Sequence, residues 1–210
     1  MMWLYKVAYP GWKFNGSQIQ PDVRTVEGEI ERVVGGRCAL MSRTDAGVSA
    51  KGNILVIDKK LKVDRINAQF KDAVIWARAE VEKVPKVKHR HYRYFLVDGR
   101  DPGYLKKFDG THDFADYTKA KTDTVRDVKV KLSDSGDVGY VDFFSRGFLW
   151  NQVRRMVGNG KTDSPGPLVL VDIIFENAPT WTFFTRWLEM LKKEQLTHMA
   201  KALTLNTMID

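Results

Sequence analysis

Residues 38–58, CALMSRTDAGVSAKGNILVID, hold a tight polar segment between two apolar stretches. The first stretch, residues 38–42, predicts a short strand, and the run NILVID at 53–58 predicts a buried one. Between them, Gly47 can adopt the positive φ that a tight turn requires. We therefore expect Asp45 to be raised on a turn that joins two strands.

Around this segment, the first hundred residues alternate between the periods of strands and helices. Large side chains at every second position predict a strand over residues 3–9, and helical spacing predicts a helix over residues 26–34. Two more strands are expected around residues 79–84 and 90–97. A second helix, capped by Asp64, would carry an apolar face of Ile66, Phe70, Ala73, Val74 and Ala77.

The second half of the chain repeats this mixture of elements. Strands are expected over residues 128–132, 138–145 and 168–175, and a helical stripe runs from Leu149 to Val157. A C-terminal helix would carry Trp181, Phe184, Trp187, Leu188 and Leu191, whose aromatic side chains could form an intersubunit face or pack within their own subunit. The order predicts an α+β protein of two similar α+β halves, residues 1–100 and 101–210, sharing a largely antiparallel central sheet with helices packed on one side.

Composition limits the classes of protein that fit. Hydrophobic residues make up 43% of the chain, which is enough for a core, and 34 Lys and Arg against 26 Asp and Glu give a net charge of +8. Such a surplus favours polyanionic partners through counterion release. The single cysteine excludes an internal disulfide, and the four histidines lack the spacing of metal ligands. We expect no metal, no membrane-spanning helix, no signal peptide and an intracellular location.

Three segments could carry chemistry, and each has a plain structural alternative. Asp45 on its turn could act as a nucleophile or base, or it could serve only as a turn residue. The strand around Tyr92 interleaves bases with aromatic residues, which suits RNA, although a half-buried strand with a solvated basic face fits equally well. Arg154 and Arg155 lie beside an apolar helical stripe, where one guanidinium could turn toward a carboxylate while the other lines the solvent edge.

Taken together, these segments resemble one known family. SRTDAGVSA at 42–50 is similar to a family motif of Gly-Arg-Thr-Asp-Ala-Gly-Val-His-Ala that follows a strand. Further similar blocks occur in the family's order: Tyr9-Pro10-Gly11, Phe14-Asn15-Gly16, Gln18-Ile19-Gln20, TVEGEIE at 25–31, HYRYFL at 91–96, GTHDF at 110–114, FLWNQVRRMVG at 148–158 and GPLVLVDIIF at 166–175. The family is that of the tRNA pseudouridine synthases that modify positions 38–40, and the resemblance spans residues 3 to about 175.

The resemblance implies an isomerase that converts uridine to pseudouridine in the anticodon stem-loop of tRNA without a cofactor. It implies Asp45 as the catalytic aspartate, Tyr92 as the ring packed on the target base, and Arg154 as the partner of the aspartate. Arg43 would help to open the RNA. Further contacts with RNA, in a cleft between the halves, are expected from Thr44, Lys88, Arg90, Arg93, His112, Phe148 and Arg155. A cytoplasmic homodimer is also implied.

The chain departs from the family pattern at several positions. Ser42 and Ser49 replace the motif's glycine and histidine, Pro10 replaces an early acid, His91 precedes Tyr92, and the segment around 161–166 is shorter than usual. These departures bear on substrate contacts more than on the aspartate, tyrosine and arginine. Two other functions therefore stay open, a non-catalytic RNA-binding module and a pseudouridine synthase that acts on a different RNA.

Overall fold

The computed structural model describes residues 1–96, 101–133, 139–160, 167–187 and 189–190. Within these residues the strands are β1 (Met2–Tyr9), β2 (Ala39–Leu40), β3 (Ser49–Ile57), β4 (Val74–Val81), β5 (Val87–Leu96), β6 (Gly110–Asp113), β7 (Val125–Ser133), β8 (Gly139–Ser145), β9 (Leu168–Phe175) and β10 (Thr182–Phe183). The α-helices are α1 (Val26–Val34), α2 (Val63–Asn67) and α3 (Gln152–Val157), and short 3-10 helices are η1 (Gly11–Lys13), η2 (Pro102–Phe108) and η3 (Ala115–Tyr117).

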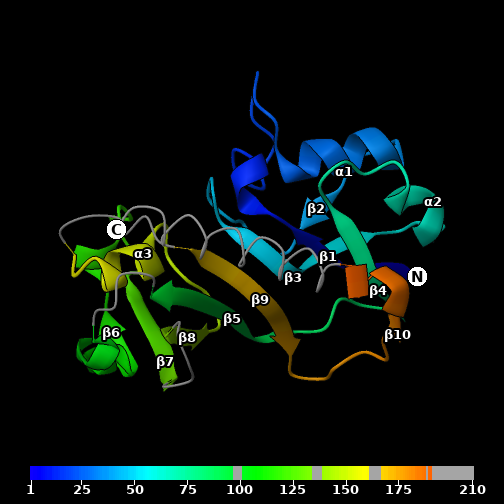
Figure 1. The fold of residues 1–210 in the computed structure, drawn as a ribbon. Helices are drawn as coiled ribbons and strands as arrows, with labels where there is room; N and C mark the ends of the chain where they lie inside the picture. Colours follow the sequence, from blue (N-terminus) through cyan, green and yellow to red (C-terminus); the bar gives the residue numbers. More distant parts are fainter. Residues whose placement is uncertain (97–100, 134–138, 161–166, 188, 191–210) are drawn as a thin grey trace.

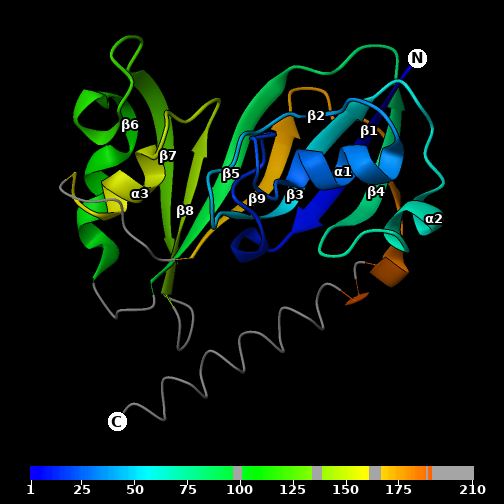
Figure 2. The same cartoon turned by 90° about the horizontal axis from the view of Figure 1, so that it is seen from above.

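All the strands belong to one sheet, in the order β10-β4-β1-β3-β9-β5-β8-β7-β6, with β2 paired to β3 beside this path. The pairing of β3 with β9 is parallel, and the other pairs are antiparallel. Helices α1 and α3 lie over the same side of this sheet (Figures 1 and 2). The predicted α+β fold with a largely antiparallel sheet is therefore confirmed.

Helix α1 forms where the sequence predicts it and has a clear physical reason for each end. The Thr25 side chain accepts a hydrogen bond from the Gly28 N–H, and Gly35 ends the helix in the left-handed region at φ 74°. Because Ile30 and Val34 lie one turn apart on the same face, both are buried against the sheet. This packing fixes α1 over β1 and β3.

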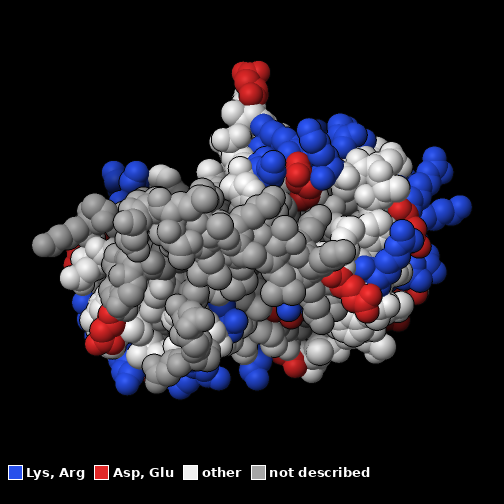
Figure 3. All heavy atoms as spheres, in the orientation of Figure 1, with Lys and Arg blue, Asp and Glu red and all other residues white. Residues whose placement is uncertain are grey.

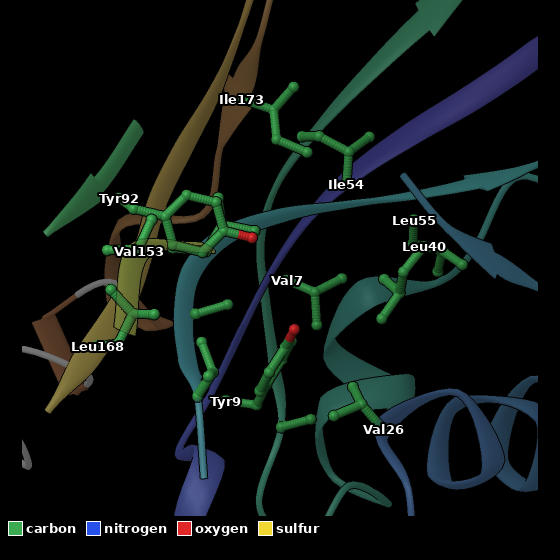
Figure 4. Close-up of a cluster of buried hydrophobic side chains, with 14 of the residues drawn as sticks. Val7, Tyr9, Val26, Leu40, Ile54, Leu55, Tyr92, Val153, Leu168 and Ile173 are labelled. Carbon is green, nitrogen blue, oxygen red and sulfur yellow. The ribbon is translucent and has the colours of Figure 1, made fainter. Parts of the chain in front are cut away.

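The basic, aromatic stretch forms strand β5, and the alternation of side chains along this strand sets which of them face the core. Tyr92 lies opposite Phe143 of β8, and Tyr94 lies opposite Val141. Because side chains alternate along a strand, both tyrosines point to the buried side, as expected from their spacing. Figure 4 shows the Tyr92 ring near Val153, in a core that also holds residues of β1 and β3.

Two predicted helices differ from the structure. The second helix ends at Asn67, and Val74–Val81 forms strand β4, which pairs with β1. Burial of nearly every residue at the start of β4 hides the alternation that marks a strand, so its local pattern also fits a helix. Near the C-terminus, Thr182–Phe183 forms strand β10, so the predicted helix begins later than expected, and residues 185–187 and 189–190 are helical.

Trp181 and Phe184 pack within their own subunit, against the core beside β4, which is one of the two predicted arrangements. Leu188 and Leu191 lie outside the described residues, so their place on the predicted helix stays a prediction. The join near residue 100 also stays a prediction, because β5 pairs on both sides with strands from later in the chain. Among the described residues, no helix combines the length and the apolar character needed to cross a membrane.

Candidate active site

The Asp45 loop is a tight turn held against the end of β1. Gly47 takes φ 78°, as predicted, and the Val48 N–H donates to the Asp45 carbonyl at 3.1 Å. A Cβ on Gly11 would lie 2.3 Å from the Val48 carbonyl carbon, so only glycine allows this approach. The Ser49 hydroxyl accepts a hydrogen bond from the Gly11 N–H at 2.9 Å, which gives this departure from the family pattern a structural role.

A buried polar network lies under the residues that precede Asp45. The Asn53 side chain donates to the Tyr9 hydroxyl at 2.9 Å and to the Ser42 carbonyl at 2.8 Å, and its oxygen accepts from the Ser42 N–H at 3.2 Å. The Tyr9 hydroxyl also lies 2.9 Å from Thr44 Oγ1. Burial raises the pKa of Tyr9, so its phenol stays protonated at neutral pH. This network fixes the backbone from Ser42 to Thr44 in one position.

The loop from Asn15 to Gln20 is bound to the same segment. The Thr44 N–H donates to the Ser17 hydroxyl at 2.9 Å, and the Ser17 N–H donates to the Thr44 carbonyl at 2.9 Å. Gly16 lies beside this contact at φ 92°. These bonds place a third stretch of chain, far from Tyr92 in sequence, beside Asp45.

Tyr92 supplies an aromatic wall next to the Asp45 loop. Its hydroxyl lies 3.2 Å from Ser42 Oγ, and its ring makes an edge-on contact with Phe148, with centroids 5.2 Å apart. Burial raises the pKa of Tyr92; the hydrogen bond with Ser42 and the charge of Arg90 oppose this rise, and the charge of Asp45 adds to it. The Asp45 carboxylate is therefore within electrostatic reach of the Tyr92 hydroxyl.

Arg154 enters the site from α3. Its Nη2 atom lies 3.8 Å from the place that a Cβ on Gly47 would occupy, so the guanidinium lies beside the Asp45 loop. Helix α3 is held by the Tyr104 hydroxyl, which donates to the Val157 carbonyl at 2.6 Å. Arg155, the next residue, donates instead to the Thr118 carbonyl at 3.4 Å. The adjacent arginines thus diverge, as the helical geometry predicts.

These elements enclose a groove of about 1010 Å³. Asp45, Tyr92 and Arg154 all line it, although they come from a loop, a strand and a helix that are distant in the sequence. Four of the residues expected to contact RNA also line it: Arg43, Thr44, Arg90 and Phe148. The Arg90 guanidinium is held near the segment that leads to Asp45, because it donates a hydrogen bond to the Met41 carbonyl at 3.0 Å.

Four other residues expected to contact RNA are not among those that line the groove. Arg93 forms a bidentate ion pair with Asp142 at 2.8 and 2.9 Å, and His112 Nε2 lies 3.0 Å from the Asp109 carbonyl. Arg155 contacts Thr118, and Lys88 is exposed on β5. A role in RNA binding for these four residues stays a prediction.

The structure also places in or under the groove several residues for which the sequence predicted no contact with RNA. Ser17, Ser42 and Trp150 line the groove, while Tyr9 and Asn53 support its floor from below. Asn53 had a recognisable signal, since an amide at the start of the apolar run NILVID is costly to bury without partners. In the part of the chain that the structure describes, no three His, Cys, Asp or Glu side chains gather to hold a metal ion.

Comparison with known proteins gives a consistent result. A family model described as tRNA pseudouridine synthase matches residues 105–176. tRNA pseudouridine synthase A of Pyrococcus furiosus is 36% identical over 176 residues, which cover 72% of this chain and 65% of the relative. The Methanocaldococcus jannaschii protein of that name is 41% identical over 55% of this chain and 50% of the relative. The chain therefore spans between half and two thirds of the length of these relatives.

The Methanosarcina acetivorans tRNA pseudouridine synthase A is 33% identical over 193 residues, which cover 76% of this chain and 71% of the relative. A solved structure of a pseudouridylate synthase aligns with a TM-score of 0.48 at 12% identity, over 89% of this chain and 71% of that chain, and the assignment does not rest on it. The extent and identity of the sequence matches show that the chain belongs to the tRNA pseudouridine synthase family.

Proposed function

We propose that this chain isomerises uridine to pseudouridine in the anticodon stem-loop of tRNA, at positions 38–40, with Asp45 as the catalytic carboxylate. The observation that carries the proposal is the shared groove, which Asp45, Tyr92 and Arg154 line together. A net charge of +8 supports a polyanionic substrate, and lysine and arginine side chains gather over α1 on one face of the molecule (Figure 3).

The reaction breaks the N1–C1′ glycosidic bond, turns the uracil and joins C5 to C1′, while C5 loses its proton and N1 gains one. The target base must first leave its stack, at a cost of a few kcal/mol. Stacking on the Tyr92 ring returns about 1–3 kcal/mol of this cost. A tyrosine phenol is protonated at neutral pH, and burial raises the pKa of Tyr92 further, so its hydroxyl can donate to the base.

Asp45 acts either by attacking the sugar or base or by removing a sugar proton. In both cases it must be ionised, and the Arg154 guanidinium beside the loop favours that form. Arg43, exposed on the same loop, is positioned to meet the RNA as the base leaves its helix. The groove therefore supplies an acid group, an aromatic ring and cations to one uracil.

The central test replaces Asp45 by Asn and measures tritium release from tRNA labelled at C5. The substitution keeps the size of the side chain and removes its charge, so turnover should disappear while tRNA binding remains. Asp58→Asn is the matched control, because Asp58 is exposed at the end of β3 and does not line the groove. Turnover by Asp45→Asn at the rate of the control would contradict the catalytic assignment.

A second substitution, Arg154→Ala, tests the partner of the aspartate. Asp45 is exposed, so loss of Arg154 should lower turnover while it changes stability little, and a fully active variant would contradict the pairing. Pseudouridine mapping of total RNA after incubation separates the remaining functions. Modification outside tRNA would indicate a different RNA target, and no modification at all would indicate a binding module.

The oligomeric state and location belong to the same proposal. We infer a homodimer that works in the cytoplasm, because the sequence resembles a family with these properties. Light scattering on the purified chain, with and without tRNA, tests the dimer directly. A monomer under both conditions would contradict it.

A further inference from the structure

We propose that Trp150 forms a second stacking site in the groove, which holds a nucleobase next to the target uridine. Its side chain is 53% exposed and lines the same groove as Tyr92 and Asp45. This inference rests on the proposed function, since it names a further contact with the same RNA. It adds an outer aromatic surface to the inner one that Tyr92 and Phe148 provide.

The Trp150 indole is exposed at the protein surface. A large indole left half in water forgoes the free energy that burial would return, and single exposed apolar residues are common on protein surfaces. Trp150 differs from such residues by position, because it lies two residues after Phe148 on the segment that leads into α3. The indole is thus carried on the wall of the groove itself.

Hydrogen bonds fix the backbone that carries Trp150. The Thr118 hydroxyl donates to the Trp150 carbonyl at 3.1 Å, and the Thr118 carbonyl in turn accepts from Arg155 at 3.4 Å. Asn151, the next residue, sits in the left-handed region at φ 57°. These contacts hold the backbone of Trp150 in place without using its ring. With this backbone fixed, only the two side-chain torsions of the indole remain to be ordered when a base stacks on it.

A cation accompanies the Trp150 ring. The Lys119 ammonium lies over the Trp150 ring, 4.7 Å from its centroid, so a base would stack on the other face of the indole. A base stacked on this indole would bring its phosphate into the field of Lys119, and Arg43 lines the same groove. An aromatic ring beside a cation is the arrangement with which proteins bind unstacked nucleotides with little sequence preference. The ligand class is therefore a nucleobase in single-stranded or loop RNA.

The test is a binding measurement with a synthetic RNA hairpin that has the sequence of an anticodon arm. Trp150→Ala should weaken binding about five- to 150-fold, and Trp150→Phe should restore most of the loss because it keeps an aromatic ring. Trp12→Ala is the matched control, because Trp12 is 59% exposed yet does not line this groove. Binding by Trp150→Ala at wild-type strength would overturn the proposal.

A cycle with abasic RNA identifies the contacted base. The hairpin is made with one abasic nucleotide at each loop position in turn, and each is bound to the wild-type and Trp150→Ala proteins. At the contacted position, loss of the base should weaken binding to the wild type and leave binding to the variant unchanged. If the losses in binding from removing the base and from removing the Trp150 side chain add up at every position, the stacking site is overturned.

The outcomes separate this inference from the proposed function. Binding that depends on Trp150, without any pseudouridine formed, would keep the stacking site and contradict the enzyme. Pseudouridine formation with no effect of Trp150→Ala would contradict the stacking site alone. A wild-type chain that does not bind the hairpin would contradict both.

Discussion

Replacement of Asn53 by Ala should cost both stability and turnover, because this amide holds the segment that leads to Asp45. Asn53 is fully buried and makes four hydrogen bonds, two from its nitrogen to Tyr9 and to the Ser42 carbonyl, and two to its oxygen from the N–H groups of Ser42 and Ile54. At about 1 kcal/mol each, the loss is about 4 kcal/mol. That is a large fraction of the roughly 5–15 kcal/mol by which domains are stable.

The same substitution should release the loop that carries Asp45, the carboxylate that we propose to be catalytic. A displacement of about 1 Å in a positioning residue can slow a reaction about a hundredfold. The measurement pairs a guanidinium denaturation curve with tritium release from C5-labelled tRNA, at a temperature where the variant is folded. We expect a lower denaturation midpoint and a fall in kcat of about this size.

Asn67→Ala provides the matched control. Asn67 is also buried, but its two hydrogen bonds both join Ile75 of β4, and neither residue lines the groove. The Asn67→Ala protein should lose about 2 kcal/mol of stability and keep the kcat of the wild type. The reasoning would be refuted if Asn53→Ala retained wild-type kcat, or if both variants lost turnover equally when folded.

Two further predictions follow from the packing of the loop and from buried phenols. Gly11→Ala should lower the melting temperature sharply, because its Cβ would lie 2.3 Å from a Val48 backbone atom. Gly36→Ala should have little effect, because a Cβ there would have no atom within 4 Å. Equal melting temperatures for the two variants would contradict the close approach. Burial raises the pKa of Tyr5 and of Tyr9 above their usual values near 10. The unfolded chain therefore releases these protons first as the pH rises, so this stabilisation is complete below about pH 10 and is lost above it. The midpoint of urea unfolding should fall from pH 8 to pH 11, and it should fall less steeply in Tyr9→Phe than in the wild type. If the midpoint depended on pH in the same way in both proteins, the raised pKa of Tyr9 would be contradicted.

Much of the fold could be predicted from local pattern. Strand β9 and helix α1 have the bounds expected from their spacing, because each packs one consistent set of apolar side chains against the core. Strand β4 could not be predicted in the same way. It is buried along most of its length between β1 and β10, and an apolar run of that kind fits a helix as well as a strand.

Part of the candidate site can likewise be predicted from the sequence, and part of it cannot. Asp45 and its turn are evident from the residues around Gly47, and resemblance to the family points to Tyr92 and Arg154. The supporting residues are not evident, because Asn53 and Tyr9 meet the Asp45 segment only after β1 and β3 pair. Their contacts depend on the register between strands, which no single segment specifies.

The sequence by itself determined the types of residue available for chemistry, the ends of α1 and β9, and the turn that raises Asp45. Those features are local, since backbone freedom, capping and periodicity act within a few residues. Only the tertiary structure decided that Arg154 turns toward the Asp45 loop while Arg155 turns away, and that Arg90 lines the groove while Arg93 pairs with Asp142. The physical reason is that strand pairing and helix packing choose which face of each element is enclosed, and they join residues that lie far apart in the chain.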